Sequence, residues 1–194
     1  MDVKTYSTAL RELAKESLNK AAESFGFMIR QKLEVKDITL SDNGKGEDFF
    51  SVSSETPYLL TTEVIGDMNG KSYLLFSHEN AEQVFKICTG VGVNESSMGI
   101  DLILKEIDNI VSAASISVLA DKLKNRIYGD VPHFFEFSKK EVEKMINSDF
   151  EKFMSQRDQV LIQCKLEAPD IDLSVDFIWI LSGDILNRIS DDQK

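Results

Sequence analysis

The chain has 194 residues, of which 42% are hydrophobic, and its formal net charge is -11. This length and composition suit one well-buried globular core, and they exclude a disordered chain. Because the charge is strongly negative and no basic stripe offsets it, nucleic acids and anionic membrane surfaces are excluded as expected partners.

Membrane, secretion and metal signals are missing from the sequence. No apolar run approaches the roughly 20 residues that span a bilayer. Residues 1–10 resemble the start of an amphipathic helix rather than a signal peptide, so a cytoplasmic location is predicted. Cys88 and Cys164 stand far apart without a CxxC pair or a Cys/His cluster, and neither a disulfide framework nor a metal site is expected.

The first half of the chain contains both helical and extended patterns. Its predicted elements are a helix over 3–32, a polar loop over 41–48, strands over 59–66 and 71–76, and a short helix over 79–88. Asn69-Gly70 is a turn signal that makes the two strands a β-hairpin. Ser77 can cap the short helix at its start, and Gly90 can end it.

A linker rich in Gly, Asn and Ser, over 90–97, leads into the second half. The strongest helical pattern of the chain follows at 98–127, where apolar residues cover a broad face. The elements predicted after it are a strand over 133–137, a helix over 138–153, strands over 159–167 and 173–181, and a last short helix over 183–189.

The two halves match in their order of elements and in local sequence. The segment YLLFS at 73–77 resembles IWILS at 178–182, since each is an apolar strand that runs into a serine. A tandem duplication explains this match, with repeats at about 1–90 and 97–194 inside a single domain over 1–194. The predicted fold is a pseudo-twofold α/β arrangement of two layers, in which the long helices pack on a shared antiparallel sheet.

Each long helix carries the spacing Glu-x-x-Asn at an equivalent place. The first pair is Glu16 and Asn19, and the second is Glu106 and Asn109. Residues three apart lie on one face of a helix, so each pair can act together. This spacing arises often by chance, but its recurrence in both helices gives it more weight.

Residues 102–132 resemble the conserved segment of the CheC, CheX and FliY phosphatases of bacterial chemotaxis, with CheC the most similar member. That pattern is an Asp or Ser, three residues, a Glu, two residues, an Asn, and later a Pro. Glu106, Asn109 and Pro132 stand at the matching separations, with 22 residues between Asn109 and Pro132. The resemblance implies a CheC-like fold over nearly the whole chain.

The chain departs from the family pattern at two places. Leu102 stands where the second motif has its leading Asp or Ser, and Asp101 lies one position early. In the first helix the leading position is Glu12, and Asp42 stands at the distance of the Pro. We therefore predict one competent site, on the second helix, and a degenerate site on the first.

The surroundings of the two pairs favour the same choice. On a helical wheel, Glu106 and Asn109 lie beside Leu102, Ala113 and Ile116, a mixture that suits a docking patch. The first pair lies among other charged residues, which is typical of a solvated face. Pro132, Asp101, Leu102 and Ala113 are expected to support the second site.

The resemblance implies a phosphatase that acts on a phosphorylated CheY-like response regulator. Asn109 would orient the attacking water, and Glu106 would contact the active-site lysine of the regulator. No cofactor of the protein's own is expected, since the receiver domain supplies Mg²⁺. A CheD-like protein is a further candidate partner, and both monomers and homodimers fit the family.

A second hypothesis belongs to a different class. The chain would then be a catalytically silent CheC-like module that binds a receiver domain, a CheD-like deamidase or a flagellar switch component. The intact Glu106, Asn109 and Pro132 favour the enzyme, whereas Leu102 favours the silent module.

Overall fold

The structure is a computed structural model that describes residues 3–42, 57–93, 99–154, 159–182 and 185. The helices in this part of the chain are α1 (Val3–Ile29), α2 (His78–Thr89), α3 (Ile100–Leu123), α4 (Lys139–Met154) and the short 3₁₀ helix η2 (Pro169–Ile171). The strands are β1 (Glu34–Asp42), β2 (Tyr58–Gly66), β3 (Gly70–Phe76), β4 (Ile127–Gly129), β5 (His133–Glu136), β6 (Gln159–Ala168) and β7 (Leu173–Ser182).

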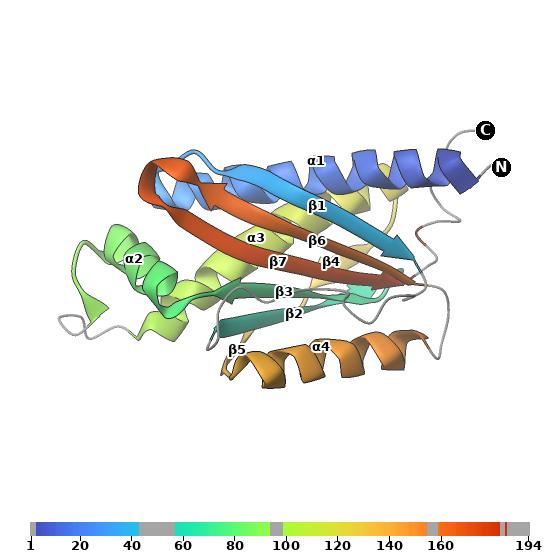
Figure 1. Cartoon of the computed structure of the whole chain (residues 1–194). Coiled ribbons are helices and arrows are strands. Elements are labelled where there is room, and N and C mark those ends of the chain that lie inside the picture. The colour runs from blue at the N-terminus through green and yellow to red at the C-terminus, as the bar shows by residue number, and fades with distance from the viewer. Residues whose placement is uncertain (1–2, 43–56, 94–98, 155–158, 183–184, 186–194) are drawn as a thin grey trace.

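The described strands form one antiparallel sheet with the order β1-β6-β7-β3-β2-β4, and β5 pairs with β2 beside β4 (Figure 1). β4 and β5 thus share one edge of β2 and are separated by a short turn. At the centre of the sheet, β3 pairs with β7, and Tyr73 lies opposite Ile178. The segments 73–77 and 178–182, which resemble each other in sequence, therefore lie on adjacent strands and meet where Tyr73 pairs with Ile178.

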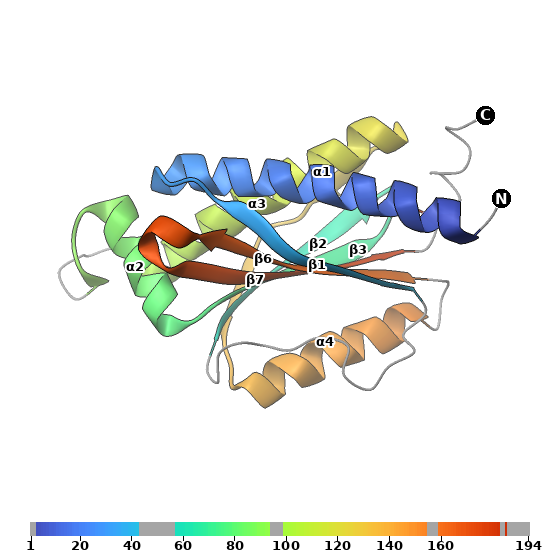
Figure 2. The ribbon, with the colours of Figure 1, turned by 45° about the horizontal axis from the view of Figure 1, so that its top comes forward.

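Helices cover both faces of the sheet. α1 and α3 lie on one face, and α4 lies on the other (Figure 2). β3 shows the division clearly, since Leu74 and Phe76 enter the larger core with α1 and α3, whereas Tyr73 and Leu75 enter a smaller core with α4. Alternate side chains of a strand point to opposite faces, so both faces of this strand are apolar.

The predicted fold class is confirmed, because the two long helices pack on a shared antiparallel sheet. The prediction of two layers was incomplete, since α4 adds a partial third layer. The single domain over 1–194 and its origin as two repeats stay predictions.

Local signals placed several elements correctly. The predicted hairpin is β2–β3. The predicted short helix is α2, where the side chain of Ser77 accepts a hydrogen bond from the backbone N–H of Asn80 at 3.1 Å. Gly90 ends α2 in the left-handed conformation, with φ 77°, which favours glycine.

The largest errors in the predicted element bounds concern β1 and the end of α3. No strand was predicted over β1, and its last two residues were predicted to belong to the loop over 41–48. The rest of that loop, from 43 on, lies outside the described residues. The second long helix ends at Leu123 instead of 127, because Lys124 turns left-handed, with φ 50°, and its N–H bonds to the carbonyls of Ala120 and Asp121. The chain released there forms β4. The last helix, predicted over 183–189, falls almost wholly outside the described residues.

Candidate functional site on α3

One stripe of α3 faces away from the core and carries the predicted site. Leu102, Glu106, Asn109 and Ala113 are all exposed, with 55% of the Leu102 surface accessible. Their spacings of four, three and four residues place them along one side of the helix. The structure thus brings the two predicted catalytic residues together with two of the predicted supporting residues, although their catalytic roles stay predictions.

Glu106 and Asn109 make no side-chain hydrogen bond or ion pair with any other described residue. A carboxylate can accept hydrogen bonds on both oxygens, and an amide can both donate and accept. Both groups are therefore available to a partner, with no internal contact to break first.

The remaining supporting residues flank this stripe. Asp101, in the first turn of α3, forms an ion pair with Lys105 at 3.0 Å. Pro132 is buried in the turn that separates β4 from β5. This edge of the sheet packs on α3, since a Cβ atom added to Gly129 would lie 3.2 Å from Cδ1 of Ile116. Pro132 therefore lies at the edge of the sheet that packs on α3, and its supporting role stays a prediction.

Two apolar side chains on the same edge remain exposed. Tyr128, in β4, has 59% of its surface accessible, and Val131, in the turn that follows, has 70%. Ile127 and Gly129 face α3, so alternation along β4 points Tyr128 toward the opposite face of the sheet, and Tyr128 does not extend the stripe.

Beneath the stripe lies a buried polar cluster that the sequence analysis missed. Asp108 is fully buried, and the hydroxyl of Thr62, on β2, donates a 2.6 Å hydrogen bond to its carboxyl. Ser112, one turn along α3, lies 3.5 Å from the other carboxyl oxygen and 3.1 Å from the hydroxyl of Ser72, on β3. We call Thr62, Ser72, Asp108 and Ser112 the Asp108 network.

Burial raises the pKa of Asp108 to about 7, and the hydrogen bonds from Thr62 and Ser112 oppose this rise only in part. The sequence did contain a signal for the network. Asp108 lies on the same helical face as Leu104 and Val111, so an acidic residue interrupts the apolar side of the helix.

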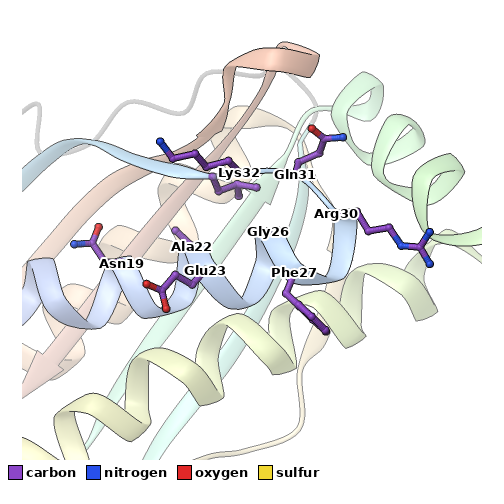
Figure 3. Close-up of a pocket in the computed structure, with 9 residues that line it drawn as sticks. Asn19, Ala22, Glu23, Gly26, Phe27, Arg30, Gln31 and Lys32 are labelled. Atoms are coloured by element: carbon purple, nitrogen blue, oxygen red, sulfur yellow. The ribbon is translucent and has the colours of Figure 1, made fainter.

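The first Glu-x-x-Asn pair, on α1, has different surroundings. Glu16 and Asn19 are both exposed, but the Glu16 carboxylate pairs with Lys122 of α3 at 3.0 Å. Asn19 lies at one end of an open groove of about 530 Å³ that follows the last turns of α1 (Figure 3). Phe27 lines this groove with 89% of its surface exposed, and its side chain points toward the side on which α3 runs in that view.

The described part of the chain has neither a metal-binding cluster nor a helix suited to a membrane. No group of three or more His, Cys, Asp and Glu residues there could hold a metal ion. None of the helices in that part combines the length and the apolar character needed to cross a bilayer.

Comparisons with known proteins rest on structure alone, since no family model and no curated protein matches the sequence. FliY of Thermotoga maritima superposes with a TM-score of 0.66 at 12% identity, over 98% of this chain and 96% of FliY. CheX of Borrelia burgdorferi, in a complex with CheY, BeF₃ and Mg²⁺, gives 0.61 at 13% identity, over 86% of this chain and 96% of CheX. A CheC-like protein from Shewanella sp. PV-4 gives 0.57 at 13% identity, over 94% of this chain and all of that protein, 100%.

The chain has the CheC/CheX/FliY fold. This confirms the resemblance that residues 102–132 suggested, at the level of the fold. The matches do not decide between members of this group, so CheC as the most similar member stays a prediction.

Proposed function

We propose that this protein accelerates the dephosphorylation of a CheY-like response regulator through Glu106 and Asn109. The observation that carries the proposal is the exposed pair on α3, which has no partner among the described residues, in a fold shared with a CheX that forms a complex with CheY. The reaction is hydrolysis of an aspartyl phosphate. A water oxygen attacks phosphorus, the bond from phosphorus to the aspartate oxygen breaks, and inorganic phosphate leaves.

Asn109 is the residue that orients the attacking water in this proposal. Catalysis of phosphoryl transfer depends mainly on positioning and on electrostatics, because the protein contributes little covalent chemistry. An amide holds a water by both accepting and donating a hydrogen bond, and it has no negative charge that would repel the phosphoryl group.

Glu106 lies one helical turn from Asn109 and fixes the position of the receiver. Its carboxylate accepts hydrogen bonds from the active-site lysine of the regulator, and a charge-assisted contact of this kind sets register as well as affinity. The exposed Leu102 and Ala113 supply apolar contact around Glu106 and Asn109.

The proposal needs no cofactor bound by this chain, because the receiver contributes the Mg²⁺ that neutralises the phosphoryl oxygens. A CheD-like partner, the oligomeric state and a cytoplasmic location stay expectations from the sequence.

A silent binding module is the second candidate function, and Leu102 is the observation that favours it. An exposed leucine replaces the Asp or Ser that leads the family motif. The same stripe would then bind a receiver domain, a CheD-like deamidase or a flagellar switch component without promoting hydrolysis.

Two measurements on the same samples separate these candidates. The decay of a phosphorylated CheY-like receiver from the same genome is followed with and without the protein, and binding of that receiver is measured by calorimetry. An enzyme shortens the lifetime of the phosphoryl group, whereas a silent module binds and leaves the lifetime unchanged. We expect acceleration by the wild type, with Glu106→Ala weakening binding roughly tenfold, the loss of one charge-assisted hydrogen bond. Binding without acceleration would favour the silent module.

A further inference from the structure

Asp108 stands directly before Asn109 and is buried at the contact of α3 with the sheet. When the two Glu-x-x-Asn segments are aligned, the corresponding residue of α1 is Leu18, which is also fully buried. An apolar side chain therefore fills this position on the other long helix. Packing alone therefore does not require a carboxyl group at this position. Burying an acidic side chain costs stability, which suggests that Asp108 has a role beyond packing.

The hydrogen bonds of the Asp108 network can form a closed ring when the carboxyl is protonated. Ser112 donates to the ionised carboxyl, whereas a protonated Asp108 can donate to Ser112 across the same 3.5 Å. Ser112 is then free to donate to Ser72, and Ser72 donates to the backbone carbonyl of Thr62, 3.3 Å away. The Thr62 hydroxyl donates back to Asp108 at 2.6 Å. Each of the four protons has one acceptor, and the ring joins α3 to β2 and β3.

Loss of the carboxyl proton changes this arrangement. Asp108 can no longer donate, and a full negative charge stays in a site that water does not reach. The groups that face it from β2, β3 and α3 are the hydroxyls of Thr62, Ser72 and Ser112, and no charged side chain among the described residues contributes to its pKa shift. The hydrogen bonds from Thr62 and Ser112 offset only part of the cost of burying this charge, so the ionised form favours any movement of α3 that admits water.

We propose that Asp108 is a positioning residue, whose protonated carboxyl holds the Asn109 segment of α3 against β2 and β3. We call this hydrogen-bonded connection between α3 and the two strands the Asp108 tie. It is strongest at mildly acidic pH and weakens above neutrality. Its effect on hydrolysis rests on the function proposed above, whereas its effect on α3 does not. The pKa of about 7 places the change within the physiological range.

The first test follows the backbone amide of Asn109 by NMR between pH 5.5 and 8.5, without any receiver. We expect this signal to titrate with a midpoint near 7 in the wild type and to stay constant in Asp108→Asn, which is isosteric and always neutral. Thr62→Val removes a hydrogen bond that lowers the pKa of Asp108, so the midpoint should rise. Thr61→Val, the matched control, changes a buried threonine on the opposite face of β2 and should leave the midpoint unchanged.

The second test repeats the receiver decay between pH 6 and pH 8, with the acceleration expressed relative to the receiver alone. A group with a pKa near 7 loses about 90% of its protonated form over this range. We therefore expect the acceleration by the wild type to fall up to tenfold and that by Asp108→Asn to stay level.

The outcomes of the two tests separate the two proposals. Identical pH profiles for the wild type and Asp108→Asn, with acceleration present, would overturn the positioning role and leave the proposed function standing. If no variant accelerates receiver decay, the proposed function is overturned. The NMR titration of Asn109 would then be the test of the Asp108 tie. An Asn109 signal that does not titrate in the wild type would overturn the tie. If Asp108→Asn does not fold, an unchanged midpoint in Thr62→Val would overturn it instead.

Discussion

α1 and α3 carry the same surface spacing of Glu and Asn, but the two helices differ above and below that surface. On α3, Glu106 makes no side-chain hydrogen bond or ion pair with a described residue, and Asp108 lies buried among hydroxyl groups. On α1, Glu16 is paired with Lys122, and the buried neighbour of Asn19 is Leu18. The spacing alone therefore does not define a site. Available polar groups on the surface and the way the helix is held beneath them distinguish α3.

The buried side of this comparison gives the largest expected effect, a dependence of stability on pH. In the unfolded chain the carboxyl of Asp108 has its usual pKa of 3.8. In the folded protein, burial raises this pKa to about 7. Between these values the unfolded chain has released the proton and the folded protein has not, so stability falls as pH rises and levels off above about 7. At about 1.4 kcal/mol per pH unit, this group lowers the free energy of unfolding by about 3 kcal/mol from pH 5 to pH 8.

Urea unfolding of the wild type and of Asp108→Asn at several pH values measures the contribution of Asp108 to the pH dependence of stability. The other acidic groups are common to both proteins, so only the difference between the two curves matters. We expect the variant to become the more stable protein at pH 8. A constant difference between the curves across this range would show that the buried carboxyl carries no such penalty.

The exposed faces of α1 and α3 can be compared by introducing a large side chain on each helix. Ala113→Trp adds a large side chain four residues after Asn109, and Glu23→Trp does so four residues after Asn19. We expect the first to weaken receiver binding roughly tenfold, about 1.4 kcal/mol, and the second to have no measurable effect. Both positions are exposed, so neither variant should lose much stability. Equal effects of the two variants on binding would place the docking surface elsewhere.

The smallest expected effect concerns the ion pair between the two helices. Lys122→Ala frees Glu16 and makes the α1 pair resemble the α3 pair. Both partners are about half exposed, so the loss in unfolding free energy should stay below about 1 kcal/mol. We also expect no additional acceleration of receiver decay, because α1 lacks the apolar surroundings of the α3 stripe. A clear gain in rate would make α1 a latent second site.

The sequence predicted those elements whose signals are local. Ser77 and Gly90 limit α2 because a side-chain cap and a left-handed turn depend on single residues. β1 was missed because its polar and apolar residues do not alternate cleanly, and its pairing with β6 has an irregularity between Lys36 and Thr39. The end of α3 was missed because no Gly or Pro marks it, and Lys124 takes the left-handed conformation instead.

For the site, the sequence predicted which residues share an exposed face, since helical periodicity determines this. It did not predict the contact between Asp108 and Thr62, which are 46 positions apart and meet only through the packing of α3 on β2. Nor did it indicate that Lys122 would engage Glu16, because that ion pair depends on how the two helices cross. Contacts of this kind require the tertiary structure.

The most direct test of a catalytic α3 compares Asn109→Ala with Asn19→Ala in the decay of the phosphorylated receiver, at receiver concentrations that saturate both proteins. The two variants remove the same exposed side chain from the same spacing on different helices. We predict that Asn109→Ala lowers the maximal acceleration about 100-fold, the typical loss of one well-placed polar group that acts in the transition state. Asn19→Ala should stay within twofold of the wild type. An Asn109→Ala variant that remains as fast as Asn19→Ala would contradict the assignment of Asn109 as the residue that orients the water.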